Sequence, residues 1–374
     1  MPDGGRHLPP SSRFRIVLIC VAAVITAVLD VSILFAASPL AKQPYWAPKI
    51  QTAIGLDQKG ISRFVFGLDL DELIKGRLET TQDEIRSLLR SAHIGYTGLA
   101  VSGRAVQVHI SDAAQLVLAK VTLKTLTDPS ADDDAVQELV LDESGPVLLK
   151  FVITGAGIKY LTSAALKQSV EVIKHRIHDF RRVESGISEP IVRQQGDDRI
   201  MVQVSGLKDS HRLSSILVRA AKLTVQMIDG SMPVKDALNG PLPNSSSMLY
   251  SHDDPPVPYL IENRVIVSDD NLINAKPAYS PQSNKPIVLF RVDSKGTARL
   301  SRETPQNVGS SFAVVLDGRV ISVPVIREPI LDGIGQISGN FTVEDANDLA
   351  VLLRNGRLPA RLTIVEESPM AAPK

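Results

Sequence analysis

The sequence predicts an α+β fold, because strand-like and helix-like stretches alternate along most of its 374 residues. Apolar residues recur at helical spacing after Thr81 and again between Ala156 and Asp179. Short runs in which apolar and polar residues alternate, typical of half-buried strands, lie between and after these helices. The length corresponds to two or three domains, and the 44% hydrophobic content excludes an intrinsically disordered chain.

The N-terminal stretch Ile16–Ala37 contains one charged residue, Asp30, and is long enough to cross a membrane. As a helix it would span roughly 33 Å, against a hydrocarbon core of roughly 30 Å. Three arginines precede it, so the positive-inside rule keeps residues 1–15 in the cytoplasm. A cleaved signal peptide with Ile16–Leu29 as its apolar part is the alternative. Under either interpretation the chain after about residue 40 lies outside the cytoplasm.

The first half of the exported part is predicted to begin with a linker at 38–66, which is rich in proline and glycine. The first helix is expected to begin at Thr81, in a capping box with Glu84. On the long helix expected at 156–179, Lys174 and Arg176 are expected on the exposed side. The other expected elements are strands at 99–101 and 105–110, a helix at 113–126, strands at 136–141 and 147–153, the long helix at 156–179, and a hairpin at 191–204.

Residues 206–356 are predicted to form a second unit, in which a Pro-, Ser- and Asn-rich stretch at 230–258 is expected to be a surface loop. Asp317–Gly318 lies between two apolar runs, which predicts a tight hairpin. Thr342 and Asp345 predict the start of a helix that ends at Asn355–Gly356. The other expected elements are a helix at 213–218, a strand at 222–228, a strand at 287–293, a helix at 297–307 and a final strand at 361–367.

The sequence shows no pattern typical of a catalytic, cofactor or metal site. Cys20 is the single cysteine, which excludes a disulfide within the chain. His175 and His178 have a spacing that a metal site can use, but no third ligand accompanies them, so a solvated helix face is favoured. The glycines at 154–159 lack the spacing of a phosphate-binding loop and indicate a helix N-terminus. The chain is therefore not expected to be an enzyme, and 41 basic against 41 acidic residues argue against nucleic-acid binding.

Four stretches resemble the first large periplasmic region of the SecD family, the translocon-associated subunit of the bacterial Sec export system. They are residues 154–158, 186–209, 253–268 and 312–367, of which the last is the most specific. The resemblance implies a ferredoxin-like base subdomain at 67–206, completed by 357–367, with an inserted α+β head subdomain at 207–356, a tail at 368–374, and one preceding transmembrane helix.

Two features depart from the family pattern. Residues 67–70, GLDL, resemble the start of the family's domain but lead directly into a polar helical stretch. The first strand of the base is therefore expected to be missing or replaced. The family's later membrane helices, which couple export to protons together with SecF, have no counterpart before Lys374.

The resemblance implies an accessory of Sec-dependent protein export that is anchored in the bacterial inner membrane by a single helix, with most of the chain in the periplasm. The implied partners are SecF, the SecYEG translocon and unfolded preprotein. Five apolar residues around Pro324 and Pro329 are the candidate preprotein contacts, although packing within a hairpin core is the alternative for them: Val323, Val325, Ile326, Ile330 and Leu331. Two other functions stay open: a periplasmic structural or assembly partner that keeps the fold, and a truncated paralogue without independent function.

Overall fold

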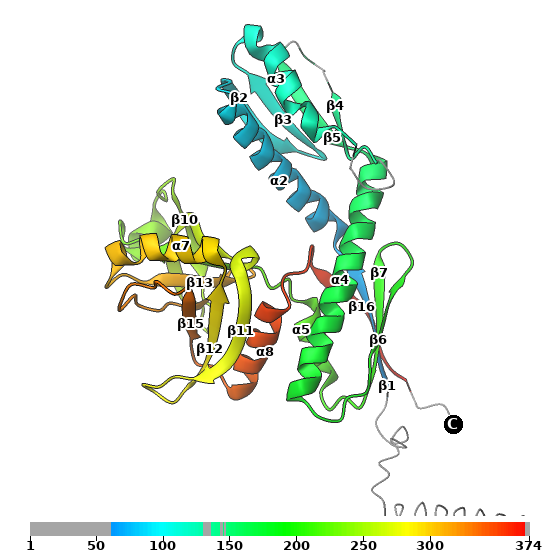
Figure 1. The fold of residues 1–374 in the computed structure, drawn as a ribbon, viewed down its shortest axis with the longest axis vertical. Helices are drawn as coiled ribbons and strands as arrows, with labels where there is room; N and C mark the ends of the chain where they lie inside the picture. The colour runs from blue at the N-terminus through cyan, green and yellow to red at the C-terminus, as the bar shows by residue number, and fades with distance from the viewer. Residues whose placement is uncertain (1–60, 130–135, 143–144, 146, 371–374) are drawn as a thin grey trace, which may run out of the picture. The chain divides into compact units, whose positions relative to one another are not determined.

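The computed structural model describes residues 61–370 apart from 130–135, 143–144 and 146. The strands of this part form four sheets, between and around which the helices pack (Figure 1). The α+β prediction is therefore confirmed at the level of a fold that combines several sheets with helices. The membrane segment predicted at 16–37 lies outside the described residues. Within the described ranges, none of the helices combines the length and the apolar character needed to cross a bilayer.

The base sheet is built on β1 (Ile61–Leu68), which is one of its two central strands. β1 pairs in antiparallel fashion with β16 (Leu362–Met370) on one side and β7 (Arg199–Ser205) on the other, and β6 (Ile191–Gln195) follows β7 at the far edge. The expectation that the first base strand is missing is therefore wrong, as is the expectation of a linker up to residue 66. Likewise, β16 takes in the first residues of the segment expected to be a tail from 368.

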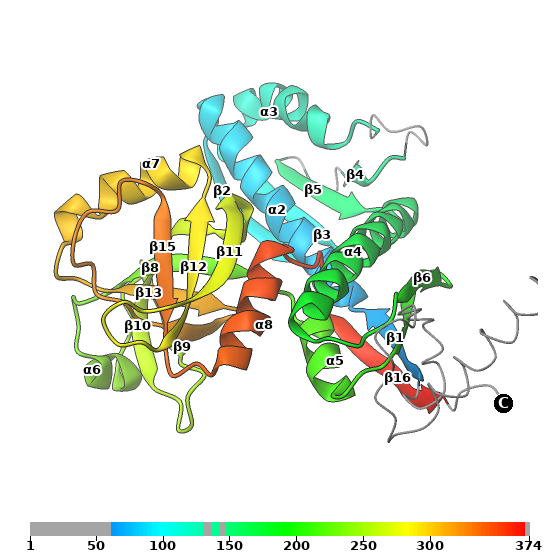
Figure 2. The ribbon, with the colours of Figure 1, turned by 60° about the horizontal axis from the view of Figure 1, so that its bottom comes forward.

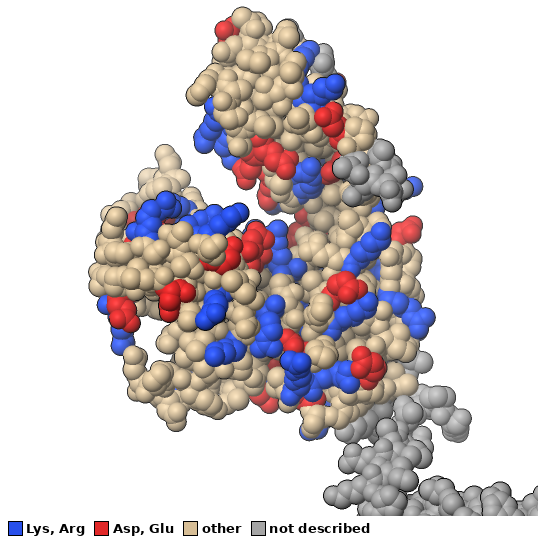
Figure 3. All heavy atoms as spheres, in the orientation of Figure 1, with Lys and Arg blue, Asp and Glu red and all other residues tan. Residues whose placement is uncertain are grey.

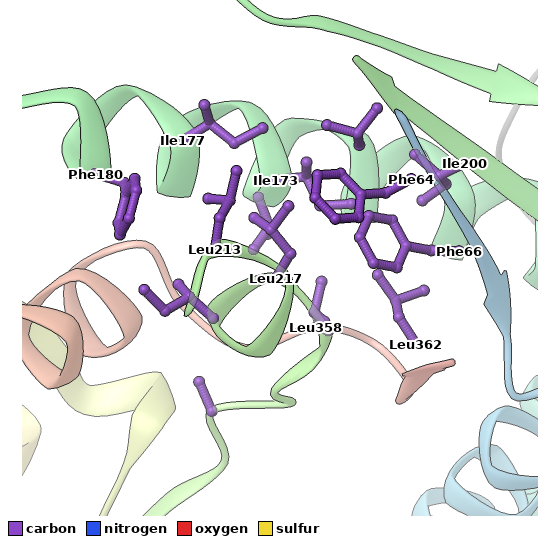
Figure 4. Packing of buried hydrophobic residues seen from close by; sticks show 14 of the residues in the cluster. Phe64, Phe66, Ile173, Ile177, Phe180, Ile200, Leu213, Leu217, Leu358 and Leu362 are labelled. Atoms are coloured by element: carbon purple, nitrogen blue, oxygen red, sulfur yellow. The ribbon is translucent and has the colours of Figure 1, made fainter. Parts of the chain in front are cut away.

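One face of the base sheet is covered by α4 (Gly155–Val183) and α5 (Ser210–Val218). The rings of Phe64 and Phe66 from β1 stack with their centroids 5.9 Å apart and lie in the same apolar cluster as residues of both helices (Figure 4). Fully burying a side chain of this size stabilises the fold by about 1.5–3 kcal/mol. Leu213 and Leu217 of α5 belong to this cluster as well, so the boundary predicted at residue 206 does not separate α5 from the base sheet.

Residues 70–153 form a second unit with its own sheet, in the order β2-β3-β5-β4, and its own apolar core. It begins with α2 (Leu70–Ser91), which Asp69 caps by accepting a hydrogen bond from the backbone N–H of Glu72. Thr81 is consequently buried inside α2, so the predicted helix start at Thr81 is wrong. The other elements of this α2–β5 unit are β2 (Tyr96–Ser102), β3 (Ala105–Ile110), α3 (Leu116–Leu123), β4 (Leu139–Asp142) and β5 (Leu148–Ile153).

The head contains a five-stranded sheet in the order β14-β13-β8-β10-β9 and a three-stranded sheet in the order β11-β12-β15. Figure 2 shows α8 beside β11 of the smaller sheet. The bounds of the head elements are β8 (Leu223–Ile228), α6 (Val234–Asn239), β9 (Ser246–Tyr250), β10 (Pro258–Ser268), β11 (Leu272–Tyr279), β12 (Pro286–Val292), α7 (Ser294–Glu303), β13 (Phe312–Leu316), β14 (Arg319–Ser322), β15 (Ile334–Ser338) and α8 (Val343–Arg354).

Several local predictions for the head are confirmed, and one is wrong. Asp317 and Gly318 both have positive φ and join β13 to β14 in a tight hairpin. Thr342 and Asp345 form the capping box of α8. The stretch 230–258, expected to be a loop, contains α6 and β9, because β9 finds the backbone partners that a surface loop lacks by pairing with β10.

Gly157 explains why glycines occur at the start of α4. Thr154 caps the helix by accepting a hydrogen bond from the backbone N–H of Gly157 at 2.8 Å. A Cβ atom at Gly157 would lie 2.5 Å from the carbonyl oxygen of Glu138, whereas one at Gly155 would meet no atom within 4 Å. The glycine therefore allows α4 to approach the chain next to β4 closely, and this geometry accounts for it without a bound phosphate.

We expect Gly157→Ala to lower the free energy of unfolding by about 1–3 kcal/mol, because backbone atoms must shift to admit the methyl group. Gly155→Ala is the matched control and should cause no loss, since alanine favours the helix and the site is open. Chemical denaturation of the two variants beside the wild type measures the difference. Equal stabilities of the two variants would contradict the close-approach explanation.

Candidate functional site

The junction between base and head is held by Arg176, a side chain of α4 that is 0% exposed. Its guanidinium donates hydrogen bonds to the carbonyl oxygens of Ile216 at 3.0 Å, Arg219 at 2.6 Å and Gly356 at 2.9 Å. These carbonyls lie at the end of α5, where the chain leaves the base, and just after α8, where it returns. Carbonyl groups at helix C-termini carry partial negative charge and favour a cation there.

Burial lowers the pKa of the Arg176 guanidinium to about 10, so the group stays a cation at neutral pH. The two crossing segments are also joined directly, because the backbone N–H of Leu358 donates to the carbonyl of Ala220 at 2.9 Å. The prediction that Arg176 lies on the exposed side of the helix is wrong. It occupies the apolar stripe of α4 between Ile173 and Phe180, and the carbonyls of distant segments compensate for its charge.

Asp179, one turn further along α4, connects the base to the end of α8. Its Oδ2 accepts hydrogen bonds from Arg354 and from the side-chain amide of Asn355, both at 3.0 Å. Arg354 in turn donates to the backbone carbonyl of Ala275 in β11. The same end of α8 is therefore fixed to the base and to the smaller head sheet.

Arg212 and Asp348 link α5 to α8 side by side. Two parallel hydrogen bonds join them, from Nε to Oδ2 at 2.8 Å and from the terminal nitrogen to Oδ1 at 2.6 Å. The hydrogen bonds that Arg212 donates to Asp348 raise the pKa of Arg212, and its guanidinium lies 5.3 Å from the ring centroid of Phe180. Since both side chains are about four-fifths buried, this pair is stronger than an ordinary surface ion pair.

A groove with a volume of about 630 Å³ lies next to this junction, between α5, α8 and β14. Buried apolar side chains form its floor, among them Ile216, Val320 and Leu352. Polar side chains line the same groove: Arg219, Ser251, His252, Asp253, Tyr259, Ser322, Ser338, Asn340, Asp345 and Asp348. The groove can therefore accommodate apolar groups on its floor while its polar residues provide hydrogen-bond partners.

The five predicted contact residues differ in how accessible the structure leaves them. Val323 lines the groove, and Val325 and Leu331 are 54% and 64% exposed. Ile330 is partly buried against the head core. Ile326 is 3% exposed within that core and has to be removed from the candidate surface, because its packing leaves no area for a ligand.

The histidines singled out in the sequence lie outside the groove. His175 and His178 are on the exposed face of α4, in a second depression that Lys174 and Arg181 also line. No group of three or more potential ligands in the described ranges has the geometry to hold a metal ion. Arg176, Arg212 and Asp348 were not identified from the sequence, although a charged residue in the apolar stripe of α4 was a readable signal for the first.

Two family models match the chain. "SecDF, P1 head subdomain" matches residues 246–360, and "Protein translocase subunit SecDF, P1 domain, N-terminal" matches residues 166–230. These ranges include α5, α8 and much of the groove, and they leave the α2–β5 unit outside. The junction and the groove therefore belong to a P1 region of the SecDF type.

Relatives support the same assignment over more of the chain. Protein translocase subunit SecD of Desulfurispirillum indicum is 32% identical over 322 residues, which cover 84% of this chain and 60% of the relative. That of Acetobacter pasteurianus is 34% identical over 322 residues, covering 86% and 59%. The chain belongs to the SecD family and spans about three fifths of these relatives. A solved structure of SecDF in a Super-membrane-facing form aligns with 92% of this chain and with 34% of the SecDF chain. The sequence identity is 20% and the TM-score is 0.48.

We expect Arg176→Met to lower the free energy of unfolding by about 3 kcal/mol or more, because buried carbonyls lose a charged donor. The free energy of unfolding of Arg176→Lys should lie between those of the wild type and Arg176→Met, since an ammonium group keeps the charge without reaching carbonyls on both segments. Lys174→Met, two residues earlier on the exposed face, is the control and should change stability by less than about 0.5 kcal/mol. Denaturation curves that show equal losses for Arg176→Met and Lys174→Met would contradict the role of Arg176 at the junction.

A double-mutant cycle of Arg212→Ala and Asp348→Ala measures the link between α5 and α8. We expect a coupling free energy of about 1–3 kcal/mol, because the pair is bidentate and mostly buried. The exposed pair Lys174–Glu171 serves as the reference and should give at most about 0.5 kcal/mol. Additive effects of the two substitutions would show that α5 and α8 are held together by other contacts.

Proposed function

We propose that this chain is an accessory of Sec-dependent protein export, and that the groove beside α5 and α8 binds extended segments of the translocating polypeptide. The observation that carries the proposal is the apolar floor and polar lining of the groove within the region that matches the SecDF P1 domain. Curated relatives over most of the chain are described as protein translocase subunit SecD. The role assigned to this chain is binding, without catalysis.

The chemistry of an unfolded chain fits this groove. An extended polypeptide exposes both apolar side chains and backbone N–H and C=O groups, and each needs a partner when water is removed. Ile216, Val320 and Leu352 provide apolar contact, while Ser322 and Asn340 provide donors and acceptors. Because Ser322 and Asn340 are short and uncharged, they can pair with the backbone of many sequences, while Arg219, Asp253 and Asp345 add charged positions to the same lining.

The finer fold assignment and the location belong to the same proposal. The order β16-β1-β7-β6, with α4 and α5 as its two helices, supports a ferredoxin-like base into which the head is inserted between α5 and β16. We assign residues 16–37 to a membrane span, the described part to the periplasm, and SecF and the SecYEG translocon to the partners. The expected absence of the first base strand is part of the support for a structural partner without an export role, and the presence of β1 removes that part.

We expect photo-crosslinkers at Val323, in the groove, and at the exposed Val325 and Leu331 to label a preprotein that is stalled during export in cells producing the full chain. A crosslinker at Leu238, which is 49% exposed on α6, is the control and should label it much less. Immunoprecipitation of the stalled preprotein identifies the adducts. Labelling of neither the preprotein nor a translocon subunit from any of the three positions would refute the proposed function.

The groove itself is tested by Asn340→Trp, which places a large side chain at an exposed position of its lining. We expect this variant to reduce crosslinking from Val323 at least threefold, because the indole occupies the volume that the polypeptide needs. Asn239→Trp, at the exposed end of α6, is the matched control. Equal crosslinking from Val323 in both variants would show that the polypeptide binds outside the groove.

A further inference from the structure

The helix α3 is apolar on two opposite sides. Ala119 and Leu123 are buried in the core of the α2–β5 unit, which accounts for one side. On the other side Val117, Leu118 and Val121 are 73%, 52% and 66% exposed. In the view of Figure 3, the part of the surface formed by this unit includes an area with few charged side chains.

The fold of the unit does not require these three exposed residues. A surface helix normally carries polar residues on its outer side, where apolar side chains gain nothing from folding. Single exposed apolar residues such as Val308 are ordinary, but three within little more than one helical turn form a contiguous patch. The largest apolar patch of a monomeric protein, about 300–600 Å² in area, is often functional.

We propose that Val117, Leu118 and Val121, named here the α3 patch, form a second contact surface for extended apolar segments of the translocating polypeptide. This inference rests on the proposed function, but it concerns a different surface from the groove. Residues 61–165 lie outside both family models that match the chain, so neither match covers the α3 patch.

The size of the patch favours a transiently bound polypeptide as its occupant. The three side chains together expose roughly 300 Å², the lower end of functional patches. A stable dimer needs about 800 Å² from each partner, so a second copy of the chain is a poor match. A helix that lies in a membrane surface uses one broad apolar side, whereas α3 divides its apolar residues between its own core and the exposed patch.

The patch also suits a ligand that must be released. It consists of side chains, since the backbone of α3 is hydrogen-bonded within the helix. Contacts of this kind are independent of the sequence of the ligand beyond its apolar character. A chain that moves past such a surface can bind and dissociate repeatedly.

The test uses the full chain in lipid nanodiscs and a fluorescent polypeptide that reduction and carboxymethylation keep unfolded. The variant carries Val117→Ser, Leu118→Ser and Val121→Ser, and the control carries Leu238→Ser and Val308→Ser at positions 49% and 50% exposed. Fluorescence anisotropy should show at least a threefold higher Kd for the variant and an unchanged Kd for the control. Circular dichroism should show that both fold like the wild type.

Each alternative occupant has its own result. If the triple serine variant binds the probe like the wild type while Asn340→Trp weakens binding, the proposal for the α3 patch is overturned and the proposed function stays intact. Flotation with vesicles of phosphatidylethanolamine and phosphatidylglycerol measures membrane binding, and sedimentation measures dimerisation. If the α3 variant abolishes either association and the control variant does not, the polypeptide is the wrong occupant and the proposal for the α3 patch is overturned. Failure of the wild type to bind the probe overturns the proposed function and the α3 patch together.

Discussion

The hydrogen bonds from Arg176 are the interaction on which the arrangement of base and head depends. The chain passes from base to head after α5 and returns after α8, and this one guanidinium binds carbonyls on both segments. A buried cation is costly unless its donors find partners, and here backbone carbonyls at two helix ends accept from both terminal nitrogens, while the buried Nε has no hydrogen-bond partner among the described residues. Losing the side chain would therefore affect both crossings at once, whereas an ordinary surface contact holds one.

Contacts at this junction position the two helices that form the walls of the groove. α8 contributes Val351 and Leu352 to the base cluster and Leu349 and Leu353 to the head cluster, so it is packed from both sides. Its neighbour α5 belongs to the base cluster and is joined to α8 by the pair of Arg212 and Asp348. Asp348, Leu349 and Leu352 take part in these contacts and also line the groove, so changes at the junction reach the groove through them.

Two local patterns in the head predicted its local structure, whereas the capping-box pattern at Thr81 lies inside α2. The Asp317–Gly318 hairpin and the capping box of Thr342 depend on residues within a few positions, and both are present. β1 was missed although Phe64 and Phe66 alternate with strand period, because the surrounding prolines and glycines favoured a linker. Arg176 was misplaced for a different reason. Its partners come from segments distant in the sequence, and no local pattern in α4 encodes their positions.

Arg176 and the α3 patch both violate the rule that charged residues face water and apolar residues face the core. The first violation is resolved within the chain, because carbonyls from α5 and the end of α8 surround the guanidinium. The second is not resolved in the part of the chain that the structure describes, where Val117 and Val121 stay largely exposed. A local rule that is broken without internal compensation indicates an external partner. The same reasoning that explains a buried arginine therefore directs attention to α3, and a polypeptide in transit is a partner that exposes the matching surface.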